Sequence, residues 1–355
     1  VGAHHNLAMA FKELGEFKKA IKHHETSIKH EPENPIHYYY LSELKKDILD
    51  TNLKNKISKI LKNKNTSKGN MAYGYYLLSK FENKIKNYKK EIDCLIKGHE
   101  EFFESKKDKF KLGVKYCFDD VLQISEGVNV DKLRNKDNKE IKPIFIIGVP
   151  RCGSTLVEKI IASGEKRIPM GEETSVLENF LNQKILEKQS LNLGDGDAIK
   201  KEITDIYMQK GLISEKNNYI FTDKSLNNFF YLNFIKSVFP DAKIINCKRN
   251  ILSSIMSIFQ NNLTELAWAH DLENIFKYCD NYFKILNKFK EKNSNFIYDL
   301  EFEKFTRDPE IESKKLMKFC DLVWDKKCLS FYKRKDIISK TTSYKQIRKA
   351  IYKHP

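Results

Sequence analysis

A short loop between a predicted strand and a predicted helix carries residues that could bind a phosphate group. Residues 144–148 (IFIIG) form a continuous apolar run with β-branched side chains, which is typical of a buried parallel strand. The loop VPRCGST follows, and the amphipathic stretch LVEKIIAS then predicts a helix. Such a loop aims its amides and the start of the helix at one anion. The segment therefore predicts a phosphate site.

The composition of this loop bears on which phosphate it binds. Gly148 and Gly153 have the spacing of a Walker A loop, but Ser154 stands where the lysine of that motif belongs, and Thr155 follows it. Arg151 places a cation inside the loop instead. Without the lysine, the reach to a γ-phosphate is lost. The loop suits a 5′-phosphate that bears something other than a triphosphate, and a P-loop nucleotide kinase or NTPase is the alternative.

Two further predicted strands end in charged residues. NYIFT (218–222) predicts a second strand that ends in Asp223 and Lys224, and FPDAKIINCKR predicts a third that ends at Arg249. Ligands of open α/β sheets bind at the carboxyl ends of the strands, so Lys224 and Arg249 are expected at the site. Ser257 lies eight residues after Arg249, about two turns into the next predicted helix.

An acidic segment, GEET (171–174), follows the first predicted helix of this region. Transfer of a group to a hydroxyl needs a base that removes the proton, and either Glu172 or Glu173 could serve. The alternative is that these acids favour the N-terminus of a helix beginning near VLENFL, where negative charge is stabilised.

These motifs together resemble those of PAPS-dependent sulfotransferases. GVPRCGSTLVE (148–158), the Asp-Lys strand end and the Arg249…Ser257 pair carry the resemblance, which covers residues 143–355 and is closest to the tetratricopeptide-repeat sulfotransferases. The GEET segment is similar to one in tyrosylprotein sulfotransferases. The resemblance implies an α/β sulfotransferase fold, with a P-loop-type parallel sheet and flanking helices. It also implies transfer of a sulfuryl group from PAPS, with release of PAP.

The resemblance also implies residue roles. Glu173 would be the base, and Arg151 and Lys224 would stabilise charge on the leaving 5′-phosphate. The end segment TTSYKQIRKAIY resembles a loop that closes over the nucleotide, and Phe302 stands where the family usually has a tyrosine near the adenine. No metal ligand is expected. The residues implied to bind the nucleotide are Arg151, Cys152, Gly153, Ser154, Thr155, Arg249, Ser257, Ser343 and Arg348.

The N-terminal third reads as helical. Residues 1–34 fit one tetratricopeptide repeat, in which the small residues Ala8 and Ala20 let two helices approach closely. Residues 49–68, rich in Lys and Asn, are interpreted as a connector, and residues 71–105 as another helical pair. This region is either a packing scaffold or a surface for a protein or peptide. The predicted domains are 1–128 (helical), 129–142 (linker) and 143–355 (sulfotransferase domain).

The bulk composition limits the partners. The net charge is +16, but the lysines are spread along the chain, which favours a small polyanionic ligand over nucleic acid. No apolar run reaches the roughly 20 residues of a membrane helix, which predicts a cytoplasmic protein. Because Val1 falls inside a helical pattern, we expect the natural N-terminus to be missing, so a lost signal or anchor stays open. The seven scattered cysteines predict reduced thiols and no structural metal.

The acceptor is left open by the sequence. GEET favours a tyrosine-containing peptide or protein, whereas the branch as a whole is compatible with carbohydrate hydroxyls. The acceptor pocket is expected in residues 177–214 and 261–269, and the oligomeric state is not readable. A third alternative is a repeat-based interaction protein whose transferase domain is inactive.

Overall fold

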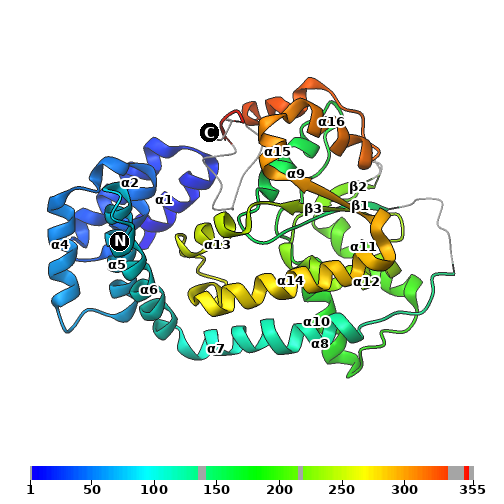
Figure 1. The fold of residues 1–355 in the computed structure, drawn as a ribbon, viewed down its shortest axis with the longest axis horizontal. Helices are drawn as coiled ribbons and strands as arrows, with labels where there is room; N and C mark the ends of the chain where they lie inside the picture. The colour runs from blue at the N-terminus through cyan, green and yellow to red at the C-terminus, as the bar shows by residue number, and fades with distance from the viewer. Residues whose placement is uncertain (1, 135–140, 215–218, 335–347, 352–355) are drawn as a thin grey trace. The chain divides into compact units, whose positions relative to one another are not determined.

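The computed structural model describes residues 2–134, 141–214, 219–334 and 348–351. The chain divides into two compact units (Figure 1). The helical unit comprises residues up to Lys115 together with Ile255–Phe276. The sheet unit comprises Tyr116–Ser254 and Lys277–Arg334, together with the described residues 348–351.

The helical unit is built from antiparallel helix pairs, as its sequence predicts. Ala8 and Ala20 are fully buried where α1 packs against α2, and Gly15 makes the turn between them with a φ of 81°. Gly98 similarly lets α6 approach α5, because a Cβ there would lie 2.8 Å from the Tyr76 ring. The helices are α1 (Gly2–Leu14), α2 (Phe17–His30), α3 (Pro35–Leu44), α4 (Thr51–Lys62), α5 (Lys68–Lys84), α6 (Tyr88–Ser105) and α7 (Lys107–Lys115).

The interpretation of residues 49–68 as a connector is wrong, because α4 occupies Thr51–Lys62. The Asp50 side chain caps this helix by accepting a hydrogen bond from the Leu53 amide at 2.8 Å. Ile57 and Ile60 are buried on its inner face. Lysine and asparagine fill the remaining positions, so the composition concealed an amphipathic pattern.

The sheet unit contains four parallel strands in the order β2-β1-β3-β4. They are β1 (Lys142–Ile147), β2 (Ile220–Asp223), β3 (Lys243–Lys248) and β4 (Ile297–Glu301). Because all four run the same way, their carboxyl ends share one edge of the sheet. Arg249 directly follows β3 and Lys224 directly follows β2, so both residues lie at this edge, as the sequence predicts.

Helices cover both faces of this sheet. On one face, Ile144 and Ile146 share a core with Val157 of α9 (Ser154–Ala162) and Leu316 of α16 (Pro309–Phe319). On the other, Tyr282 of α14 (Leu272–Asn293) donates to Asn246 of β3. Burial on both faces explains the nearly continuous apolar strands, and the predicted α/β class is confirmed. The other α-helices of the described residues are α8 (Val121–Gly127), α10 (Val176–Lys188), α11 (Gly196–Gln209), α12 (Leu232–Val238), α13 (Ile251–Phe259) and α15 (Phe302–Arg307).

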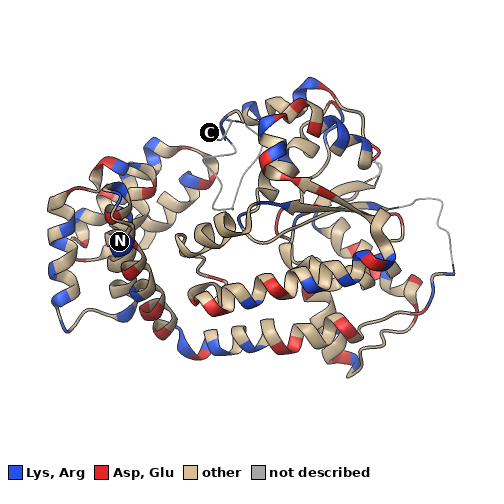
Figure 2. Cartoon of the chain, in the orientation of Figure 1, with Lys and Arg blue, Asp and Glu red and all other residues tan. Residues whose placement is uncertain are grey.

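Charge is distributed along both units. Figure 2 shows Lys and Arg interspersed with Asp and Glu on the helices of each unit.

Within the described ranges, no helix combines the length and the apolar character that crossing a membrane would require.

Candidate active site

The phosphate loop joins β1 to α9 and needs both of its glycines. A Cβ at Gly148 would lie 2.4 Å from the Cys152 sulfur and 2.8 Å from the Cys247 carbonyl oxygen. Gly153 has a φ of 95°, which is strained for any residue with a side chain, and it immediately precedes α9. Arg151 also has a positive φ, 72°. The loop is therefore held in a tight conformation that ends at the start of a helix, where anions bind favourably.

Gly153 has a second reason to lack a side chain. Phe302, the first residue of α15, lies against it, and a Cβ at Gly153 would be 2.3 Å from the Phe302 ring. Phe302 thus packs on the phosphate loop. The sequence placed it only near a nucleotide base.

This contact predicts a specific stability loss. Gly153→Ala should lower the free energy of unfolding by about 2 kcal/mol more than Gly211→Ala does. Gly211 has a φ of 72°, and a Cβ added to it would meet nothing within 4 Å, so it shares the backbone strain without the clash. Urea denaturation of the two variants measures the difference, and equal losses would refute the contact.

Two arginines meet at the loop. The Arg249 side chain donates to the Arg151 carbonyl oxygen at 2.9 Å, and its guanidinium lies 5.3 Å from the centre of the Phe302 ring. Burial, and then the charge of Arg249, lower the pKa of Arg151. Like charges this close repel, so a bound anion would relieve the repulsion between them.

A buried lysine faces the site from the end of β2. The Lys224 side chain is 0% exposed, and its ammonium donates to Glu173 Oε1 at 2.6 Å. Burial alone would lower the pKa of Lys224, but the carboxylates of Glu173 and Glu158 outweigh it and raise the pKa. Glu173 is 56% exposed, so its carboxylate is open to a partner from outside. The pair therefore offers a fixed cation and an accessible carboxylate.

The GEET turn is fastened to the end of β2. The Glu172 carbonyl accepts from the Lys224 amide at 2.8 Å, and Thr174 Oγ1 donates to Asp223 at 3.1 Å. A Cβ at Gly171 would lie 2.3 Å from the Thr222 carbonyl oxygen, so the turn approaches the strand closely. Helix α10 begins only at Val176, and the Glu173 carboxylate is directed to Lys224. This geometry favours Glu173 as part of the site over the helix-terminus alternative.

A family model described as "Sulfotransferase family" matches residues 143–326, more than half of the chain. This chain belongs to the sulfotransferase family. The matched range contains the loop, both arginines and the Lys224–Glu173 pair.

The chain is also similar to several curated proteins. An uncharacterized protein of Aquifex aeolicus (strain VF5) is 28% identical over 291 residues, which cover 78% of this chain and 38% of that protein. Protein-tyrosine sulfotransferase 1 of Danio rerio is 24% identical over 212 residues, covering 53% and 55%. Protein-tyrosine sulfotransferase A of Caenorhabditis elegans is 27% identical over 208 residues, covering 52% and 51%. The chain thus spans about half, or less, of the length of these relatives.

Among solved structures, the sulfotransferase domain of the Synechococcus PCC 7002 olefin synthase is similar to this sulfotransferase-family chain. It is 19% identical, with a TM-score of 0.42, over 63% of this chain and 89% of that domain.

The structure brings together some of the predicted nucleotide-binding residues of this sulfotransferase-family chain. Cys152 is buried, and Ser154 and Thr155 form the buried start of α9. Arg348 is described, and burial together with the Arg348 charge lowers the pKa of Lys159 in α9 to about 8. Ser343 lies outside the described residues.

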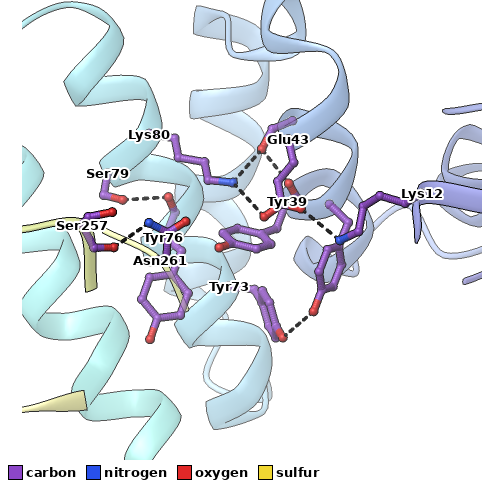
Figure 3. Close-up of polar contacts among 11 residues, drawn as sticks. Lys12, Tyr39, Glu43, Tyr73, Tyr76, Ser79, Lys80, Ser257 and Asn261 are labelled. Carbon is purple, nitrogen blue, oxygen red and sulfur yellow. Dashed lines mark hydrogen bonds and ion pairs between the residues drawn. The ribbon is translucent and has the colours of Figure 1, made fainter. Parts of the chain in front are cut away.

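Ser257 belongs to α13, in the part of that helix that falls in the helical unit. Its carbonyl oxygen accepts from Asn261 at 2.6 Å (Figure 3).

In the same unit, the carboxylate of Glu43 forms ion pairs with two lysines. It lies 3.3 Å from the Lys12 ammonium and 3.9 Å from the Lys80 ammonium (Figure 3).

Two buried carboxylates that support the site were not assigned roles from the sequence. Asp223 accepts hydrogen bonds from Tyr207 at 2.7 Å, Thr174 at 3.1 Å and Asn228 at 3.1 Å. Glu158 is 1% exposed within α9, and burial raises its pKa to about 7 although Lys224 opposes the shift. In the sequence, the sign of a buried role for Glu158 was an acidic residue within the apolar run LVEKII.

Among the residues that the structure describes, no three His, Cys, Asp or Glu side chains form a group that could hold a metal ion.

Proposed function

We propose that this chain transfers a sulfuryl group from PAPS to a hydroxyl or amine acceptor and releases PAP. The observation that carries the proposal is the buried Lys224 ammonium bonded to the accessible Glu173 carboxylate. Arg151 of the phosphate loop lies within electrostatic range of both Glu173 and Arg249. A base and three cations therefore converge where the strands end.

The residues present fit a phosphosulfate donor. The loop and the start of α9 offer amides for the 5′-phosphate, and the Arg151–Arg249 repulsion favours a polyanion. Ser154 takes the place of the lysine that a triphosphate would need. Arg249 would hold the 3′-phosphate, and Arg348 would contact the nucleotide from the end segment. Ser257 keeps its predicted role as a nucleotide-binding residue.

The chemistry follows from the pairing of Lys224 with Glu173. The acceptor oxygen forms a bond to sulfur, the bond from sulfur to the bridging phosphate oxygen breaks, and its electron pair stays on the phosphate of PAP. The acceptor proton passes to Glu173. Neutral Glu173 no longer balances Lys224, so the ammonium becomes available to the charge developing on the phosphate. Arg151 supports the same charge from the loop.

We propose a peptide or protein tyrosine as the acceptor, with carbohydrate as the alternative. The relatives named protein-tyrosine sulfotransferases and the GEET segment support this choice. The 56% exposure of Glu173 supports a large acceptor, because a buried base would be out of reach of a protein chain. The tetratricopeptide-like helices would help to dock it. The proposal thus includes a helical domain (1–128), a linker (129–142) and a sulfotransferase domain (143–355).

Nucleotide selectivity tests this function against the kinase and inactive-domain alternatives. PAP without magnesium should raise the melting temperature, because a ligand at a hundredfold excess over its Kd adds about 2.7 kcal/mol of stability. Arg249→Ala should abolish the shift. Arg307→Ala, an exposed arginine of the same unit paired with Asp308, should keep it.

Three other outcomes would count against the proposal. Stabilisation by ATP with magnesium, but not by PAP, would favour a kinase or NTPase. PAP binding without sulfuryl transfer to any tyrosine peptide or carbohydrate would favour the inactive domain. A PAP shift that survives Arg249→Ala would remove the arginine from the site.

A further inference from the structure

Glu158 is a carboxylate buried where an apolar side chain would be expected. It lies one turn into α9, 1% exposed, beside the fully buried Val157 and Ile160. A buried acid is destabilising unless hydrogen bonds or an opposite charge compensate it. The contacts of Glu158 show what it is compensated by.

The carboxylate holds the backbone of the GEET turn. Glu158 Oε1 accepts from the Glu172 amide at 2.9 Å and from the Thr222 hydroxyl at 2.8 Å. The carbonyl of the same Glu172 accepts from the Lys224 amide at 2.8 Å. Glu172 has a φ of 49°, a strained conformation that persists only when its surroundings enforce it. The bonds to the amide and to the carbonyl of Glu172 therefore hold its backbone on both sides. This fixes the turn immediately before Glu173.

The Glu158 carboxylate also interacts electrostatically with the Lys224 ammonium, which pairs with Glu173 as well. Among the residues that the structure describes, the charged groups that face Glu158 are Lys224 at the end of β2, Glu172 on the turn and Lys159 on its own helix. Lys224 in turn is influenced by both Glu173 and Glu158. One ammonium thus serves two carboxylates, one accessible and one buried.

We propose that Glu158 is a positioning residue for the transfer: its carboxylate clamps the turn that presents Glu173 and gives Lys224 a second counter-charge. The inference rests on the proposed function. When Glu158 is ionised, it draws on the Lys224 charge, so Glu173 binds a proton more readily and is the stronger base. When Glu158 is protonated, the ammonium acts on Glu173 alone. Because burial raises the pKa of Glu158 to about 7, kcat should rise with pH through neutrality.

The kinetic test separates this role from a merely structural one. Glu158→Gln should lower kcat about tenfold at and above neutral pH, keep the donor KM within about twofold, and remove the rise of kcat near neutrality. Glu312→Gln, another buried glutamate of the sheet unit, should leave the profile unchanged. An unaltered pH profile in Glu158→Gln would overturn the proposal, as would an equal effect from Glu312→Gln.

Hydrogen exchange tests the clamp without any substrate. Glu158→Ala should speed amide exchange in the peptide 169–175 about tenfold or more, whereas Glu312→Ala should not. Unchanged exchange would refute the clamp whatever the activity. If exchange is faster in Glu158→Ala but the native protein does not bind PAP, the clamp is retained and the proposed function is refuted. If Glu158→Ala does not fold, Glu158→Met, which is similar in size to the native side chain but cannot accept these hydrogen bonds, carries the exchange measurement.

Discussion

Glu173→Gln should reduce kcat for sulfuryl transfer by about 10²–10⁴-fold and leave the donor KM nearly unchanged. The amide keeps the size of the side chain and can still accept from Lys224, but it cannot take the acceptor proton. Glu173 is 56% exposed and separate from the phosphate loop in sequence, so donor binding should be preserved. Steady-state kinetics with PAPS and a tyrosine peptide measures both constants.

Glu172→Gln is the matched control for this prediction. Glu172 precedes Glu173 in the same turn, but its Oε1 is buried and its backbone is held on both sides. Its substitution should cost far less kcat than that of Glu173. If Glu172→Gln proves the more damaging change, the base is Glu172 and the roles of the two acids are exchanged.

The sequence predicted the parts of the site that follow directly from strand and loop patterns. Apolar runs located β1 and β3, and parallel strands necessarily place Lys224 and Arg249 at one sheet edge. The loop glycines were predicted from their spacing, and the structure adds the close approaches that require them. These features depend on residues adjacent in the chain, so local patterns were sufficient.

What the sequence could not predict depends on contacts between distant segments. Phe302 lies against Gly153 although 149 positions separate them, a proximity set by how α15 follows β4. Glu158 looked like one polar residue in an amphipathic helix. Its partners Thr222 and Glu172 belong to two other segments, and only the folded chain shows that they meet at one oxygen. Helix α4 was missed because lysine and asparagine dominate its composition.

The cations of the sheet unit differ in how the protein balances them. Lys224 is balanced by two carboxylates, whereas Arg151 and Arg249 repel each other at the loop. The arginines are therefore suited to bind a permanent polyanion. Lys224 is suited to respond to a charge that develops only when Glu173 takes up a proton.

Lys224→Met should have the largest combined effect on activity and stability. Loss of the ammonium should lower kcat by about 10²–10³-fold, because the cation that Glu173 releases to the developing phosphate charge is then absent. It should also lower the free energy of unfolding by about 1 kcal/mol at about pH 8, because Glu158, without its counter-charge, must then take up a proton that the native protein has released. Urea denaturation and the kinetic assay measure the two effects. Lys243→Met, a half-buried lysine on β3 paired with Asp321, is the control and should show neither.

The pH dependence of the Lys224→Met loss identifies Glu158 as its source. Burial raises the pKa of Glu158 from 4.5 to about 7, so the folded protein binds this proton more tightly than the unfolded chain does. The stability that Glu158 contributes is full below about pH 4.5 and is lost as pH rises through 7, about 3 kcal/mol in all. Without Lys224 the pKa rises further, so the deficit of Lys224→Met should grow from about pH 5.5 to about pH 8.5. Adding Glu158→Gln should recover most of that growth, since a neutral amide does not titrate. A deficit that is constant across this range would show that packing, and not the Glu158 charge, explains the loss.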